Sequence, residues 1–106
     1  LALAAKPRSK VVPRRTRRVT FRALLRNTGD VGAGGVKVCA RTKRRLLTLR
    51  GKACRVARIP AGGERSLRFT FGIRRAAAGK RVKIRLVANG DEVRKRTTTA
   101  TLRVKR

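Results

Sequence analysis

Hydrophobic and polar residues alternate one by one in four stretches of the chain, which is the pattern of a β-strand with one buried face. These stretches are residues 18–26, 66–73, 81–88 and the C-terminal segment 99–105. Arginine, lysine and threonine occupy most of the outward positions. The residues that the pattern turns inward are Val19, Phe21, Ala23, Leu25, Leu67, Phe69, Phe71, Ile73, Val82, Ile84, Leu86, Ala88, Ala100, Leu102 and Val104.

Shorter strands are predicted between these four. Residues 35–41 and 54–59 each show a brief alternation, and leucines within residues 42–53 favour a further short strand. The inward positions of the first two segments are Val36, Val38, Val56 and Ile59.

The N-terminal residues 1–16 predict a basic lead-in containing an edge strand in two pieces, Leu1–Ala5 and Lys10–Val12. Pro7 and Pro13 interrupt it, and proline belongs at a sheet edge because it has no N–H to donate to a neighbouring strand.

Turn signals separate the predicted strands. Asn89-Gly90 favours a tight hairpin, since both residues tolerate positive φ. Asn27–Asp30 and Pro60–Gly63 are rich in turn-forming residues. Gly32–Gly35 predicts a flexible connection, and residues 74–80 predict a single helical turn.

About seven short strands at this spacing predict an all-β antiparallel sandwich, with a small closed barrel as the alternative. The 106-residue length fits a single domain over residues 1–106. No apolar run approaches the roughly 20 residues of a membrane-spanning helix. Because the chain does not start with Met, we expect it to be a piece cut from a longer protein.

The charge goes beyond what a fold needs. Thirty-two Lys and Arg residues oppose four acids, and the formal net charge is +28. A surface of almost one sign favours a function in binding polyanions, since arginine offers a planar set of donors suited to phosphate, sulfate and carboxylate. Solubility alone is the competing interpretation.

The candidate polyanion-binding residues fall on strands and in loops. Arg18, Arg22 and Arg26 recur at every fourth position of one strand, and Arg81, Lys83 and Arg85 at every second position of another. Loop clusters are expected at 14–15, 17–18, 43–45, 74–75 and 94–96. The further candidates are Lys43, Arg44, Arg45, Arg94, Lys95, Arg96, Arg103 and Lys105.

The absence of exposed aromatic residues and of a groove-reading element limits the possible modes of binding. The aromatic residues, Phe21, Phe69 and Phe71, occupy inward positions, so no platform for base stacking is expected. No helix or ribbon for reading the major groove is evident. Binding is therefore expected to be electrostatic, indifferent to sequence and strongly dependent on salt.

Catalysis and metal binding are not expected. The chain has no histidine and no tyrosine, and adjacent Asp91 and Glu92 point to opposite faces of a strand. We interpret these two acids as hairpin residues that pair with neighbouring arginines. Two cysteines without histidine cannot complete a zinc site, and no cofactor is predicted. Cys39 and Cys54 favour a disulfide and an oxidising compartment, with two free thiols as the alternative.

Four motifs in order, Asn27–Asp30, Gly35–Cys39, Cys54 and Ile59–Gly63, carry a family resemblance. From about residue 17 to the C-terminus the chain resembles the CARDB (cell-adhesion-related) domains of bacterial exported proteins. The resemblance implies an immunoglobulin-like sandwich of about seven strands, secreted or on the cell surface, with a disulfide joining Cys39 and Cys54. It implies no active site, and the family's role as a spacer does not require a charge of +28.

Two further functions compete with binding of polyanions. One is a structural or adhesion spacer in a larger exported protein, whose charge docks an acidic neighbouring domain. The other is a supercharged scaffold suited to entering cells or carrying cargo. The predicted partners of the first function are DNA or RNA, anionic glycans or cell-wall polymers, and acidic lipid head groups. The isolated domain is expected to be a monomer.

Overall fold

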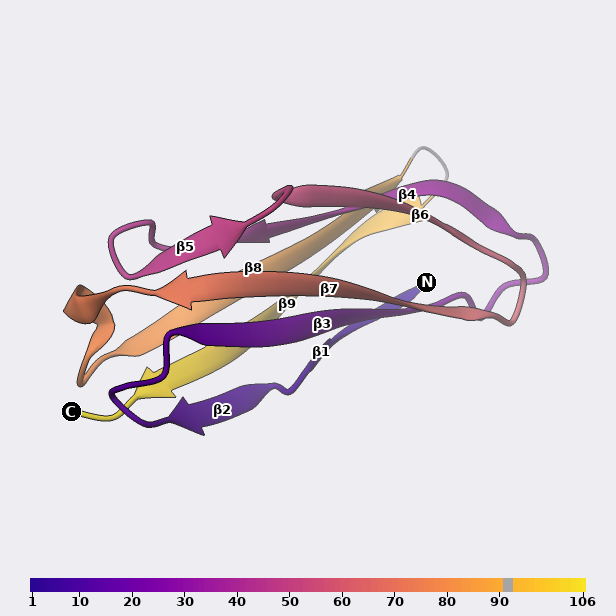
Figure 1. Ribbon diagram of the computed structural model, residues 1–106. Coiled ribbons are helices and arrows are strands. Elements are labelled where there is room, and N and C mark those ends of the chain that lie inside the picture. Colours follow the sequence, from indigo (N-terminus) through magenta and orange to yellow (C-terminus); the bar gives the residue numbers. More distant parts are fainter. Residues whose placement is uncertain (91–92) are drawn as a thin grey trace.

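The computed structural model describes residues 1–90 and 93–106 and shows two sheets packed face to face (Figure 1). The four-stranded sheet has the order β1-β3-β7-β5 and the five-stranded sheet the order β2-β9-β8-β4-β6. The pairing of β2 with β9 is parallel, and the other strand pairings among the described residues are antiparallel. The strands are β1 (Ala2–Lys6), β2 (Ser9–Val12), β3 (Arg18–Arg26), β4 (Ala33–Arg41), β5 (Leu47–Arg50), β6 (Cys54–Ile59), β7 (Glu64–Ile73), β8 (Arg81–Gly90) and β9 (Val93–Val104).

This arrangement is an immunoglobulin-like antiparallel β-sandwich, so the predicted fold class is confirmed. The described strands number nine rather than about seven. The edge strand in two pieces accounts for part of the difference, because β1 lies at the edge of one sheet and β2 at the edge of the other. The chain changes sheets between Lys6 and Ser9, at the proline that the sequence placed there.

The core lies between the sheets and follows the predicted alternation. On β3 the residues Val19, Phe21, Ala23 and Leu25 are buried, and Val82, Ile84, Leu86 and Ala88 match them on β8. Phe21 and Phe71 meet edge to face, with ring centroids 6.4 Å apart.

The prediction for β6 was wrong at Val56, whose side chain is 66% exposed. Cys54 lies opposite Cys39, which faces outward on β4, so the residues of β6 at even spacing from Cys54 also face outward. Ile59 is buried as predicted. Arg55 takes an inward position at the open edge, with its guanidinium carbon 6.0 Å from the ring centroid of Phe69.

Cys39 and Cys54 form a disulfide between neighbouring strands of the five-stranded sheet, with their Cα atoms 4.0 Å apart. The bond therefore staples the edge strand β6 to β4 on the outer face and does not link the two sheets. A disulfide of this kind indicates an exported protein that folds in an oxidising, non-cytoplasmic compartment.

Two further predictions require correction. Gly32–Gly35 is not simply a flexible connection, because β4 already begins at Ala33. A β-bulge between Ala33 and Val36 takes up one extra residue there, and Gly35 provides the positive φ of 66° that such a bulge favours. Residues 94–96 belong to β9 and not to a loop.

The prediction of a tight turn at Asn89-Gly90 was wrong, because both residues lie within β8, and the predicted hairpin residues Asp91 and Glu92 lie outside the described residues. The helical turn predicted in residues 74–80 is confirmed as a 3₁₀ turn at Arg75–Ala77.

The two other predicted turns are joined by one side chain. Asn27 is 5% exposed, and its Nδ2 donates to the carbonyl oxygens of Val31 at 2.8 Å and Ile59 at 3.2 Å. Its Oδ1 accepts a hydrogen bond from the Gly29 N–H at 3.0 Å. Because every polar atom of this amide has a partner, Asn27 can be buried at low cost while it connects the two turns.

Candidate polyanion-binding surface

The most continuous basic surface lies on the outer face of the five-stranded sheet. Arg81, Lys83 and Arg85 occupy three successive outward positions of β8, and all three are exposed. Side chains two residues apart on one side of a strand are separated by about 6.6–6.8 Å. The buried residues between them hold β8 against the core, so the fold fixes the direction in which the three cations project.

Neighbouring strands extend this row sideways. Arg103 of β9 lies directly opposite Arg81, and Arg41 of β4 lies directly opposite Arg85. We call these five residues, Arg41, Arg81, Lys83, Arg85 and Arg103, the β8 surface. Like charges directly opposite each other on a sheet are destabilising. The arrangement therefore opposes folding and at the same time concentrates positive potential along one line.

The outer face of the four-stranded sheet is different. Arg18, Arg22 and Arg26 lie on it as predicted, but partly buried Thr20 and Leu24 separate them. Arg22 has Lys6 on one side and Arg68 on the other. This single basic row is flanked by uncharged ones, namely Thr20 with Thr70, whose hydroxyl oxygens are 3.1 Å apart, and Ala4 with Leu24 and Ser66.

On this second face, an acidic side chain pairs with a basic one at one corner only, among the described residues. The Nε atom of Arg26 lies 3.5 Å from Oε1 of Glu64 on β7, and both side chains are largely exposed. Within residues 1–90 and 93–106, this is the one ion pair that the geometry provides.

The predicted basic residues are thus not brought together in one site. The set on β3 and the set on β8 lie on opposite outer faces of the sandwich (Figure 1). Residues 43–45 lie in the connection between β4 and β5, and residues 94–96 lie in the first half of β9. Lys105 follows the last strand.

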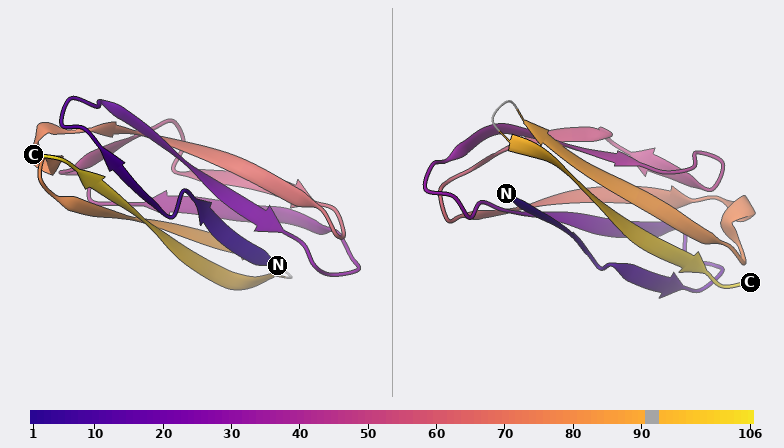
Figure 2. Two further views of the ribbon diagram at one scale, coloured as in Figure 1. Left: turned by 90° about the horizontal axis from the view of Figure 1, so that it is seen from below. Right: turned by 180° about the vertical axis from the view of Figure 1, so that it is seen from behind.

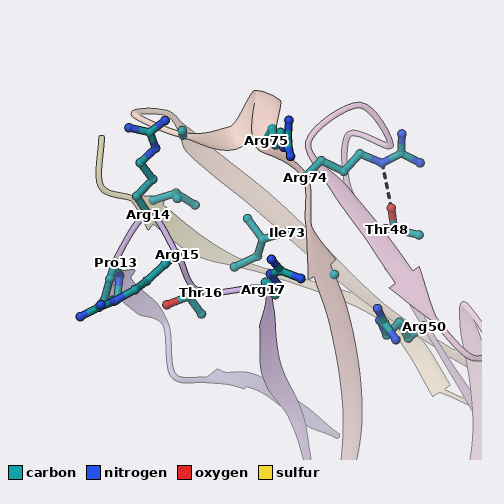
Figure 3. A pocket seen from close by; sticks show the side chains of 13 residues that line it. Pro13, Arg14, Arg15, Thr16, Arg17, Thr48, Arg50, Ile73, Arg74 and Arg75 are labelled. Atoms are coloured by element: carbon teal, nitrogen blue, oxygen red, sulfur yellow. Dashed lines mark hydrogen bonds between the residues drawn. The ribbon is translucent and has the colours of Figure 1, made fainter.

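A third basic region was not predicted as a single site. Six arginines from three segments line an open hollow at the end of the sandwich near the C-terminus (Figure 3). The sequence showed the pairs 14–15 and 74–75 as separate clusters and gave no sign of Arg50. Their convergence depends on which loops share an end of the sandwich, which the order of strands in each sheet determines.

Other kinds of site find little support in the described part of the chain. In residues 1–90 and 93–106, no group of three or more His, Cys, Asp or Glu side chains is placed to hold a metal ion. No helix there is long and apolar enough to cross a membrane.

No protein-family model matches the sequence, and no curated protein matches it. Solved structures resemble the fold at low sequence identity. The periplasmic chaperone SfaE superposes with a TM-score of 0.71 at 6% identity, over 98% of this chain and 56% of the chaperone. A family 123 glycoside hydrolase from Clostridium perfringens gives 0.65 at 9% identity, over 92% of this chain and 23% of the hydrolase.

The secreted serine protease VesC from Vibrio cholerae gives a TM-score of 0.57 at 14% identity, over 98% of this chain and 23% of the protease. This chain therefore spans about half of the chaperone and about a quarter of each of the two enzymes. At these identities the likeness concerns the fold alone, and it identifies an immunoglobulin-like sandwich.

Proposed function

We propose that this protein binds extended polyanions through the β8 surface, by electrostatic attraction and without sequence specificity. The observation that carries the proposal is the row of Arg81, Lys83 and Arg85, widened by Arg41 and Arg103 directly opposite. Such a row reduces stability unless anions occupy it, so a ligand with regularly spaced negative charges compensates the repulsion.

The spacing of these cations suits a charged polymer. Successive side chains of β8 lie about 6.6–6.8 Å apart, and phosphates or sulfates of a polymer also recur every several ångströms. Arginine engages such groups through two parallel hydrogen bonds. The ligands that meet this description are nucleic acid, anionic glycan or cell-wall polymer, and a membrane of acidic lipids.

Sequence-specific recognition is disfavoured by the position of the aromatic residues. Phe21, Phe69 and Phe71 are all fully buried in the core, so they offer no stacking surface to a base. The disulfide is consistent with action outside the cytoplasm, and we place the protein in secreted material or on a bacterial cell surface, as its resemblance to CARDB domains implies.

A salt titration of binding to duplex DNA and to heparin tests the proposal. Affinity for both ligands is expected to fall steeply with salt, with a logarithmic slope of about −0.9 per phosphate contacted on DNA. Replacing Arg81, Lys83 and Arg85 by Gln removes three contacts and is expected to reduce that slope by about 2.7.

The matched control carries Arg18→Gln, Arg22→Gln and Arg68→Gln on the opposite outer face. It loses the same number of charges and is expected to change the slope by less than half as much. Equal effects of the two triple variants would show that net charge, and not the β8 surface, governs binding.

A spacer in a longer exported protein is the second candidate, and the shape of the molecule favours it. The sandwich measures 47 × 20 × 17 Å, and Leu1 and Arg106 lie apart along its length (Figure 2). Weak binding of DNA and heparin at about 0.15 M salt, where charges act over roughly 8 Å, would favour this role.

A further inference from the structure

The hollow at the end of the sandwich has a rim of arginines and is also lined by apolar residues. It is open, has a volume of about 1330 Å³, and is bounded by the connection between β2 and β3, the end of β5, the end of β7, the turn that follows β7 and the end of β9. Its apolar lining includes Gly72, Ile73, Ala78 and Val104. Six arginines surround it, and none of the described residues that line it is acidic; the six are Arg14, Arg15, Arg17, Arg50, Arg74 and Arg75.

Backbone hydrogen bonds hold the walls of the hollow together. The N–H of Ile73 donates to the carbonyl oxygen of Arg17 at 2.8 Å, which joins the start of β3 to the end of β7. The N–H of Arg74 donates to Leu46 O at 3.0 Å, and the N–H of Gly79 donates to Val104 O at 2.8 Å. Segments far apart in the sequence are therefore fixed relative to one another before any ligand arrives.

The arginines of this rim do not all have the same freedom. Arg74 is oriented by a hydrogen bond from its Nε to Thr48 Oγ1 at 2.8 Å. Arg50 lies beside Gly72. A Cβ atom at that glycine would be 3.4 Å from Arg50 Nε.

Figure 3 shows Ile73 with the side chains of Arg14, Arg17 and Arg75 around it. Arg15 points away from Ile73, and Arg74 extends towards Thr48. The side chains that Figure 3 shows around Ile73 therefore come from two different connections. They can reach one molecule from several sides, whereas the cations of the β8 surface all project from one sheet.

We propose that this hollow binds a compact oligophosphate, a ligand with two or more phosphate groups on a small body. Six arginines stand around the hollow, so one phosphate ion would engage only part of the rim. Each guanidinium can hold two phosphate oxygens through charge-assisted hydrogen bonds. The inference deepens the proposed binding of polyanions by adding a second site with its own ligand class.

Isothermal titration calorimetry with inorganic tripolyphosphate tests this site at about 0.15 M salt, with orthophosphate as the comparison ligand. Tripolyphosphate is expected to bind one equivalent at least tenfold more tightly than orthophosphate. The variant Arg17→Gln, Arg50→Gln, Arg75→Gln is expected to lose at least tenfold in affinity for tripolyphosphate. Circular dichroism and urea unfolding of each variant establish that it is folded.

The triple variant of the β8 surface is the matched control, because it removes the same number of charges. It is expected to keep its affinity for tripolyphosphate within threefold while it loses affinity for heparin. Equal losses of tripolyphosphate binding in the two variants would overturn the proposal. In the parent protein, failure to bind heparin together with intact binding of tripolyphosphate would overturn the proposed function and leave the hollow as a site.

A second variant separates geometry from charge. Arg17→Lys, Arg50→Lys and Arg75→Lys keep the net charge but replace each planar fork by a single ammonium group. The affinity for tripolyphosphate is expected to fall at least fivefold. Unchanged affinity would show that the hollow attracts anions only through its charge, and would overturn the assignment of a site built for phosphate groups.

Discussion

The two sheets bury faces of the same kind but expose faces of different kinds. Towards the core, β3 and β8 both present four buried apolar residues at alternate positions. Towards solvent, β3 alternates arginines with Thr20 and Leu24, and its neighbour β7 supplies Glu64, whereas β8 presents Arg81, Lys83 and Arg85 in succession. The fold requires the inner pattern alone, so the outer difference is free to serve binding.

The largest effects are expected where the sheets are alike. Phe71→Ala in the four-stranded sheet should lower the free energy of unfolding by about 3–5 kcal/mol, and Leu86→Ala in the five-stranded sheet by about 2–5 kcal/mol, because each leaves a cavity in the core. Urea unfolding at constant salt measures both. Val56→Ala is the control and should change stability by less than about 0.5 kcal/mol, since its side chain is largely exposed. A loss below 1 kcal/mol at either core position would show that the two inner faces do not contribute alike to the free energy of unfolding.

The disulfide distinguishes the five-stranded sheet and should give the next largest effect. The double variant Cys39→Ala, Cys54→Ala is expected to lose about 3 kcal/mol of stability, because the bond closes a loop with a sequence separation of 15 residues. Urea unfolding with and without reductant measures the loss. Reductant should lower the stability of the parent protein and leave the variant unchanged. The same response in both proteins would mean that reductant acts through something other than this bond.

The charges of the β8 surface should act against stability. Arg85→Thr is expected to raise the free energy of unfolding by up to about 1 kcal/mol at low salt, because it removes the like charge opposite Arg41. The gain should vanish at 1 M salt, where charges are screened within about 3 Å. Adding Arg41→Thr should contribute much less than the first substitution, since the repulsion between the pair is already gone. Thermal unfolding at several salt concentrations measures this, and a loss of stability at low salt would contradict the comparison.

The smallest effect is expected at the ion pair of the other face. Glu64→Gln should lower stability by less than about 1 kcal/mol, because both Glu64 and Arg26 are well exposed and a surface pair of this kind contributes little. Urea unfolding of Glu64→Gln, of Arg26→Gln and of the double variant gives the coupling energy of the pair. A coupling well above 1 kcal/mol would show that the four-stranded face depends on charge balance more than its exposure indicates.

The core was predictable because alternation needs no knowledge of topology. Val19 to Leu25 and Val82 to Ala88 are buried as the period of two requires. The prediction for Val56 was wrong because the alternation of a six-residue strand is too short to define its phase. What defines it is the register of β6 on β4, in which Cys54 lies directly opposite the outward-facing Cys39; the predicted disulfide joined the two segments but was not used to set the phase of β6.

The candidate surface was predictable along single strands and not between them. The row on β8 follows from sequence, but the positions of Arg41 and Arg103 beside it depend on which strands are neighbours. The hollow at the end of the sandwich depends in the same way on the order of strands. For this protein, charge and period were sufficient for the elements, and strand pairing was needed for the sites.

The parallel pairing of β2 with β9 has a mechanical consequence. Four residue pairs, from Ser9 with Thr101 to Val12 with Val104, align the two strands in the same direction. When tension pulls the chain ahead of β2 and the chain after β9 in opposite directions, these strands must slide past each other, so their hydrogen bonds are loaded together and not one after another. We therefore expect the sandwich, once β1 has detached, to resist extension in shear.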